Sequence, residues 1–108
     1  MEKTIVQQFL EDTYDMKSFR GMETVSLRPR IECKDGYKIS MQASDGHYCS
    51  PRKNLKDGMY HKVELGYPNQ FDELIDVYAE EKGSIDTVYG YVPIEVVEAL
   101  IAKHGGLK

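Results

Sequence analysis

Residues 26–42, SLRPRIECKDGYKISMQ, predict a β-hairpin whose side chains sort onto two faces. Apolar and polar residues alternate on both sides of Lys34-Asp35-Gly36, which is the period of a β-strand. The apolar set is Leu27, Pro29, Ile31, Cys33, Tyr37, Ile39 and Met41. The pattern therefore predicts one face in the core and one face in solvent.

The loop length sets the register of this hairpin. A two-residue loop at Asp35-Gly36 would put the apolar residues of the two strands on opposite faces of the sheet. A three-residue loop, with a type I turn followed by Gly36 in the left-handed conformation, brings them to the same face. The pairs expected are Cys33 with Tyr37, Ile31 with Ile39, and Pro29 with Met41.

The opposite face of the hairpin is cationic and polar, and it carries Arg28, Arg30, Lys38, Ser40 and Gln42. Arginine can bind phosphate or carboxylate through two parallel hydrogen bonds, so this face suits an anion. The alternative is a solvated sheet face on which Glu32 partly neutralises Lys38. The residues alone leave both interpretations open.

The chain has 108 residues, which predicts a single domain over residues 1–108. Its hydrophobic fraction of 41% and charged fraction of 30% are typical of a soluble globular protein. No apolar run approaches the roughly 20 residues of a membrane span. The start Met-Glu-Lys does not resemble a signal peptide, so we expect a cytoplasmic protein that does not bind a membrane.

The net charge of −4 argues against binding to duplex nucleic acid, which depends on many cations that neutralise phosphates. The charges are nevertheless uneven along the chain. Basic residues gather in 18–38, and acidic residues gather in 72–86. A local anion site on an acidic protein is therefore compatible with the composition.

Periodicity and turn residues predict the order of elements. We expect an N-terminal helix over 3–14, a connection over 16–22 and the hairpin near 24–43. A long loop over 45–58 then leads to a strand near 59–65. A helix over 70–81, capped by Asn69, is followed by a strand near 87–92 and a last helix that begins at Pro93. This order predicts an α+β fold with a small antiparallel sheet packed by N-terminal, middle and C-terminal helices.

Few residues suggest catalysis or metal binding. His47 and Cys49 could form a nucleophilic pair, but no third orienting group is evident. The cysteines and histidines lack the spacing of a zinc site, and no phosphate-binding glycine loop is present. His104 falls in the last helical turn, where an imidazolium favours the helix dipole. We therefore expect no cofactor, no metal and no enzyme activity.

Arginine and aromatic residues form the remaining inventory: Arg20, Arg28, Arg30 and Arg52, with Tyr48, Tyr67, Phe71, Tyr89 and Tyr91. Bases stack on aromatic rings and phosphates pair with arginine, so this set suits a nucleotide-like ligand. The alternative is structural, because a chain without Trp must bury several of its Tyr and Phe rings in the core.

Four segments carry a resemblance to a known family. They are 26–30 (SLRPR), 41–44 with 47–52 (MQAS and HYCSPR), 63–68 (VELGYP), and 87–93 (TVYGYVP) continuing to His104-Gly105-Gly106. Over about residues 20–106 the chain resembles small proteins encoded by phages and prophages of Gram-positive bacteria. It is also similar to the first family of Thoeris anti-defence proteins, which sequester a cyclic ADP-ribose signal and, in some members, cyclic oligonucleotides.

The resemblance implies a phage anti-defence protein that works as a homo-oligomeric sponge, binding a cyclic nucleotide immune signal without degrading it. The arginines would hold phosphates, and an aromatic ring would stack on the base. The ligand-binding residues expected on this basis are Arg28, Arg30, Arg52, Arg20, Gln42, Phe71 and Tyr89. A sponge needs affinity alone, since transition-state groups add nothing to it.

Two other functions remain open at this point. The first is a phage protein-protein inhibitor of a host defence factor, which would act through the acidic surface of 70–81: Asp72, Glu73, Asp76, Glu80 and Glu81. The second is a small hydrolase that uses His47 and Cys49.

Overall fold

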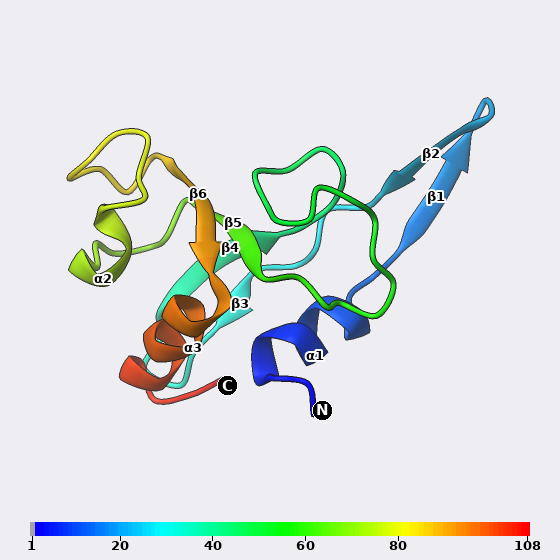
Figure 1. The fold of residues 1–108 in the computed structure, drawn as a ribbon. Coiled ribbons are helices and arrows are strands. Elements are labelled where there is room, and N and C mark those ends of the chain that lie inside the picture. The colour runs from blue at the N-terminus through cyan, green and yellow to red at the C-terminus, as the bar shows by residue number, and fades with distance from the viewer. Residues whose placement is uncertain (1) are drawn as a thin grey trace.

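The computed structural model describes residues 2–108 and shows an α+β fold, which confirms the expected class (Figure 1). The helices are α1 (Ile5–Asp12), α2 (Glu73–Asp76) and α3 (Ile94–Lys103). The strands are β1 (Met16–Phe19), β2 (Met22–Val25), β3 (Ile31–Glu32), β4 (Lys38–Gln42), β5 (Lys62–Gly66) and β6 (Val88–Pro93). None of the helices described in residues 2–108 combines the length and apolar character needed to cross a membrane.

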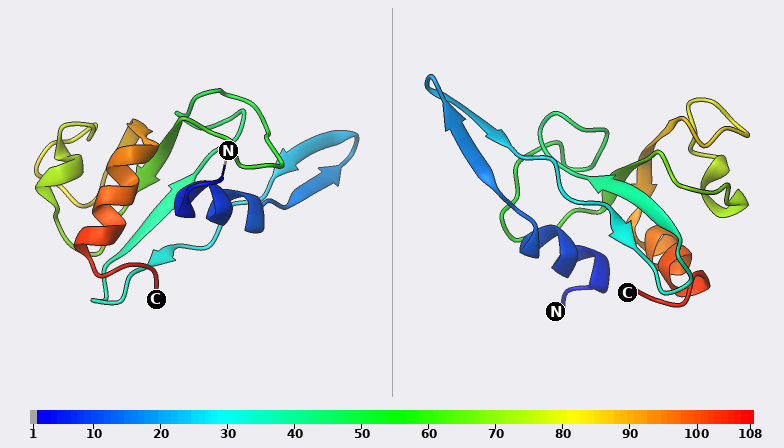
Figure 2. Two further views of the ribbon diagram at one scale, coloured as in Figure 1. Left: turned by 60° about the horizontal axis from the view of Figure 1, so that its bottom comes forward. Right: turned by 180° about the vertical axis from the view of Figure 1, so that it is seen from behind.

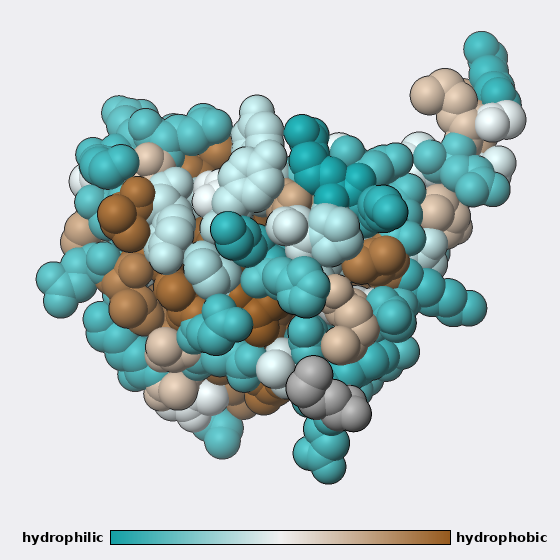
Figure 3. Space-filling model, viewed as in Figure 1, coloured by the Kyte–Doolittle hydropathy of each residue, from teal (hydrophilic) through white to brown (hydrophobic). Residues whose placement is uncertain are grey.

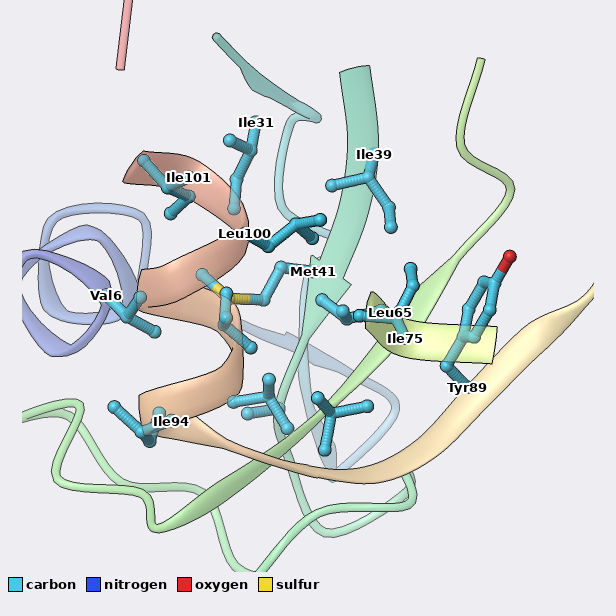
Figure 4. Close-up of a cluster of buried hydrophobic side chains, with 14 of the residues drawn as sticks. Val6, Ile31, Ile39, Met41, Leu65, Ile75, Tyr89, Ile94, Leu100 and Ile101 are labelled. Carbon is cyan, nitrogen blue, oxygen red and sulfur yellow. The ribbon is translucent and has the colours of Figure 1, made fainter. Parts of the chain in front are cut away.

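The main sheet has the strand order β3-β4-β5-β6, and every neighbouring pair is antiparallel. The long helix α3 packs on this sheet, and α1 lies beside α3 (Figure 2). The core lies between the sheet and α3, where Met41 and Leu65 from paired strands meet Leu100 of α3 (Figure 4). Burial of these side chains is the main favourable contribution to folding.

The turn predicted for the β3–β4 hairpin is confirmed. Ile31 lies opposite Ile39, and the N–H of Cys33 donates to the carbonyl of Tyr37 at 2.8 Å. Gly36 has a φ of 96°, the left-handed conformation that the three-residue loop requires. The first strand is shorter than predicted, however. It begins at Ile31, and the predicted pairing of Pro29 with Met41 does not form.

Both helices at the ends of the chain match the sequence prediction. Thr4 caps α1, and its hydroxyl accepts the N–H of Gln7 at 3.1 Å while the side chain of Gln7 accepts the N–H of Thr4. Helix α3 begins at Ile94, one residue after the predicted start, and Pro93 is its N-cap residue. The strand predicted near 87–92 is β6, and the strand predicted near 59–65 lies slightly later, as β5.

Two predicted elements are wrong. The connection expected over 16–22 is instead the start of the β1–β2 hairpin, which projects from the body (Figure 1). The helix expected over 70–81 is a single turn capped by Asp72, not by Asn69. The helix ends because the chain becomes extended, where Ala79 bridges Tyr89 and the N–H of Glu80 donates to Val88. The segment thus pairs with the outer edge of β6, which would otherwise expose unpaired backbone groups.

The C-terminal segment covers the other edge of the sheet. Leu107 bridges Cys33, the N–H of Lys108 donates to the carbonyl of Glu32, and the N–H of Lys34 donates to the carbonyl of Gly106. Both edges of the four-stranded sheet are therefore protected by short pieces of chain.

A buried histidine at the end of α3 connects the β3–β4 turn to the start of α2. His104, 5% exposed, lies between two carboxylates, with Nδ1 2.6 Å from Asp35 and Nε2 2.8 Å from Asp72. Lys103 adds an ion pair to Asp72 at 3.0 Å, and the ring of Tyr37 stacks on the imidazole at 4.0 Å. With a carboxylate on each nitrogen, the imidazole is stabilised as the doubly protonated cation. His104 caps α3, as its position suggested, but its partners come from 32 and 69 residues away.

We expect the protein to lose stability as the pH rises above neutrality. Burial alone would lower the pKa of His104, but its hydrogen bonds to Asp35 and Asp72 and their charges outweigh burial, so the pKa is raised from 6.5. A raised pKa in the folded state gives stability that is complete below the unfolded pKa and is lost as the pH rises through the folded pKa. Urea titrations should therefore show a free energy of unfolding that falls as the pH rises above 6.5.

The carboxylates of Asp35 and Asp72 make stability depend on pH in the acid range as well. Burial would raise the pKa of Asp72, but the Leu74 N–H, His104 and Lys103 lower it; the N–H of Tyr37 and then His104 lower that of Asp35. Their contribution is lost only as the pH falls below 3.8. The control is His104→Gln, which should lower stability at about pH 6 by about 3 kcal/mol and should lack the alkaline decline. An unchanged alkaline decline in this variant would contradict the assignment.

Candidate functional site

The long loop between β4 and β5 places Tyr48 against the sheet. The backbone N–H of Tyr48 donates to a carboxylate oxygen of Glu64 on β5 at 3.1 Å. The backbone carbonyl of Tyr48 accepts the N–H of Tyr91 on β6 at 3.0 Å. Both main-chain groups of Tyr48 are thus held by neighbouring strands, which fixes the position from which its side chain extends.

A β-bulge in β6 creates the space for this contact. The register shifts between Val63 and Leu65, so that Gly90 and Tyr91 together lie opposite Glu64. Tyr91 has a φ of 52°, and a Cβ atom on Gly90 would lie 3.3 Å from the Cβ of Tyr48. A side chain at position 90 would therefore push Tyr48 outward, and glycine permits the close approach.

Tyr48, Arg52 and Tyr91 form an exposed group that we name the Tyr48 cluster. The two tyrosine rings have centroids 5.9 Å apart at an angle of 39°, and the guanidinium carbon of Arg52 lies 5.6 Å from the Tyr48 ring centroid. Each tyrosine is 43% exposed. The cluster offers two aromatic surfaces beside one cation, a combination that can stack a base and pair with a phosphate.

Arg28 is placed in the interior, so the cationic surface predicted for the hairpin loses this residue and keeps Arg30 and Lys38 in solvent. Its guanidinium donates from Nη1 to Ala43 O at 2.7 Å, from Nη2 to Leu10 O at 3.1 Å and from Nε to the Thr13 hydroxyl at 3.0 Å. Burial lowers the pKa of Arg28. Because these donors already bond within the protein, Arg28 serves to join α1 to the end of β4 rather than to hold a ligand.

Gln42 is also structural. Its side-chain oxygen accepts the N–H of Arg28 at 2.9 Å, and its amide nitrogen donates to the carbonyl of Arg28 at 3.0 Å. Residues Pro29 and Arg30 do not pair with β4, and the Gln42 amide instead connects the end of β4 to the backbone of Arg28. The alternation predicted Leu27 in the core and Arg28 and Gln42 in solvent, which is wrong: Leu27 is 76% exposed and the other two are buried. The pattern fails because this part of the chain lies outside the strand, which begins at Ile31.

Substitution of Arg28 should destabilise the fold. Arg28→Ala leaves the carbonyls of Leu10 and Ala43 without their donor inside the protein, at a cost of about 2–4 kcal/mol. Arg28→Lys should also be destabilising, because one ammonium cannot reproduce the planar set of three donors. Urea unfolding measures both variants, with exposed Lys53→Ala as the control that should change stability little. Wild-type stability in both Arg28 variants would contradict the structural role.

The other predicted ligand residues lie apart from one another. Tyr89 is 1% exposed and belongs to the core, so its ring is not available for stacking in this chain. Phe71 is exposed near α2, and Arg20 lies at the tip of the β1–β2 hairpin. Of the seven residues predicted, Arg52 is the one that the structure places in the Tyr48 cluster.

Arg30 lies at a separate groove of about 340 Å³. The groove is lined by Phe9, Arg30, Ile31, Glu32, Leu107 and Lys108. Arg30 donates to the carbonyl of Tyr67, and Lys38 and Lys108 each lie 3.8 Å from Glu32. An anion in this groove would meet the Glu32 carboxylate, so the groove fits a phosphate less well than the Tyr48 cluster does.

The cysteines and histidines do not form an activated nucleophile. Cys49 is buried, and burial is the main cause that raises the pKa of its thiol, which disfavours the reactive thiolate. The Nδ1 of His47 lies 2.6 Å from the Ser44 hydroxyl. Among residues 2–108, no three His, Cys, Asp or Glu side chains are grouped for metal binding.

The acidic surface predicted over 70–81 loses one member, because Asp72 is buried and paired with His104 and Lys103.

Comparisons of the chain with family models, curated proteins and solved structures gave no match.

Tyr48 and Tyr91 were part of the aromatic inventory, but the sequence did not single them out as ligand residues. The available signal is the glycine inside the TVYGYV strand, since an interior glycine often marks a bulge or a close backbone approach. Nothing in the sequence indicated that the approaching segment would be Tyr48.

Proposed function

We propose that this protein binds and sequesters a cyclic nucleotide immune signal of the cyclic ADP-ribose type, as a phage-encoded anti-defence protein that does not degrade its ligand. The observation that carries the proposal is the Tyr48 cluster, in which two exposed tyrosine rings lie beside Arg52. The sequence resemblance to anti-defence sponges supports it independently. Cyclic oligonucleotides share the same base and phosphate chemistry and belong to the same ligand class.

The cluster matches the parts of such a ligand. A base that stacks on an aromatic side chain gains about 1–3 kcal/mol. A guanidinium held beside the ring can pair with a phosphate oxygen at the same time. The Glu64 carboxylate accepts the N–H of Tyr48 through one oxygen and keeps its negative charge, so Arg52 has to supply the attraction for a phosphate.

The exposure of the cluster supports a homo-oligomer. Each tyrosine is 43% exposed, whereas small-molecule sites typically bury most of the ligand surface. A second copy of the chain that covered the bound ligand would supply the missing surface. We therefore propose an oligomer that acts in the cytoplasm of the host cell, with ligand held partly between subunits.

The proposal predicts depletion of a nucleotide without chemical change. Purified protein is incubated with cyclic ADP-ribose isomers and cyclic di- and trinucleotides, and the filtrate and the heat-denatured protein fraction are analysed by liquid chromatography. We expect at least one nucleotide to leave the filtrate and to return intact on heating. A new product would show an enzyme, and a full panel left free in the filtrate would contradict sequestration of this ligand class.

Two variants test whether the Tyr48 cluster is the site. Arg52→Ala removes the cation, and Tyr91→Gly removes a ring while relieving the left-handed backbone at φ 52°. Both should weaken binding at least tenfold in calorimetric titrations, and Tyr91→Gly should not lower stability. Lys53→Ala, an exposed change next to Arg52, should bind as the wild type does. Full binding by both cluster variants would contradict the assignment of the Tyr48 cluster as the ligand site.

A further inference from the structure

The β1–β2 hairpin is a projecting arm, visible in two orientations (Figures 1 and 2). Its strands pair with each other and with no other strand in the described chain. Arg20 and Gly21 form the turn, both with positive φ, which is the geometry of a tight hairpin. Phe19 and Met22 flank the turn and are each 70% exposed.

This arm lacks a cover of its own. An isolated two-stranded hairpin is marginally stable in water, because it has no third strand or helix against which to bury its side chains. Two large apolar side chains at an exposed tip also mark an interaction surface rather than a solvated loop. Arg20 adds a cation beside them, with its guanidinium carbon 5.2 Å from the Phe19 ring centroid.

A second uncovered surface surrounds α2, and we name it the α2 surface. Its exposed apolar side chains are Phe71, Leu74, Val77 and Ile85. Its exposed acids are Glu73, Glu80, Glu81 and Asp86. Figure 3 shows hydrophobic side chains on the molecular surface over α2, at the end of the molecule opposite the arm. The α2 surface also holds exposed Lys82 but is acidic in sum, whereas the arm tip carries Arg20 between Phe19 and Met22, with exposed Glu23 next along β2.

We propose that the arm tip of one copy docks on the α2 surface of a second copy. Phe19 and Met22 would lie against the apolar side chains, and Arg20 would face the acids around them. Charge complementarity of this kind selects the partner and fixes its orientation. A second copy is the occupant favoured here, because one chain supplies both complementary surfaces and places them at opposite ends.

The arrangement would be head-to-tail. Two different surfaces meet in each contact, so every subunit gives one arm and receives another, and the contacts close into a ring when the rotation permits. This inference deepens the oligomer of the proposed function but uses residues outside the Tyr48 cluster. Its failure would appear in the molecular mass of the protein, whereas failure of the nucleotide proposal would appear in ligand depletion.

The test combines two variants that are each defective on one surface. Phe19→Ser with Arg20→Glu disables the arm, and Val77→Ser with Glu80→Arg disables the α2 surface. All four positions are exposed, and unchanged far-ultraviolet circular dichroism will verify each fold. By light scattering after size exclusion, the wild type should be an oligomer and each variant alone a monomer. The control Lys56→Glu, a charge reversal on the exposed β4–β5 loop, should assemble as the wild type does.

Mixing the two variants gives the decisive result. A head-to-tail contact leaves one intact arm and one intact α2 surface in the mixture, so a 1:1 heterodimer with twice the monomer mass should form. Two monomers in the mixture would overturn the proposal and would indicate arm-to-arm pairing or a different partner. A monomeric wild type, or an arm variant that still assembles, would overturn it as well.

A crosslinking measurement gives a second readout, which reports the residues that meet in the contact. Met22→Cys and Val77→Cys proteins are mixed under mild oxidation, with the native Cys33 and Cys49 both buried. A disulfide-linked heterodimer should form in the mixture and should be absent when either protein is oxidised alone. Crosslinking of Met22→Cys with itself, without the mixed product, would overturn the head-to-tail contact.

Discussion

The rest of the structure depends on the buried imidazolium of His104, which lies between Asp35 and Asp72. These residues belong to the β3–β4 turn, the end of α3 and the start of α2, so one charged group fixes three places where the chain reverses direction. Asp72 and the imidazolium need each other, because both are buried and a lone buried charge costs several kcal/mol, whereas Asp35 is partly exposed. Their pairing also directs the C-terminal segment along the outer edge of β3, and the edge strand is thereby closed.

A second buried cation organises the other side of the molecule by a different means. Arg28 bonds to backbone carbonyls and a hydroxyl, so it holds α1 and the end of β4 together through hydrogen bonds rather than through an ion pair. The loop that carries Tyr48 starts at this fixed end of β4. Because the loop is also held by Glu64 and by the N–H of Tyr91, the Tyr48 ring and Arg52 project from anchored backbone. Preorganisation of this kind lowers the entropy cost of binding a ligand.

The sequence predicted what local periodicity controls and missed what distant contacts control. The three-residue turn at Gly36, the strand 88–93 and the helix after Pro93 follow from alternation, turn residues and helix starts, and all are present. The region 70–81 has a helical stripe, yet its backbone pairs with β6 after one turn, a contact that propensity cannot reveal. Arg28 has the chemistry of a ligand residue, and only its burial shows that its donors serve the fold. For the candidate site, the sequence supplied Arg52 and the residue types, whereas the bulge that brings Tyr48 and Tyr91 together appeared only in three dimensions.

Backbone conformation offers an independent reason to look for function where we have placed it. In residues 2–108, the non-glycine residues with positive φ are Arg20, Tyr67 and Tyr91, each at 52°. A bulky side chain in this region is strained by about 1 kcal/mol or more, and glycine would relieve the strain. Tyr67 and Tyr91 each have a backbone hydrogen-bond partner: the carbonyl of Tyr67 accepts from Arg30, and the N–H of Tyr91 donates to the carbonyl of Tyr48. All three side chains are exposed, and those of Arg20 and Tyr91 lie at the arm tip and in the Tyr48 cluster. Strain kept at these two positions supports the assignment of both surfaces as contact sites.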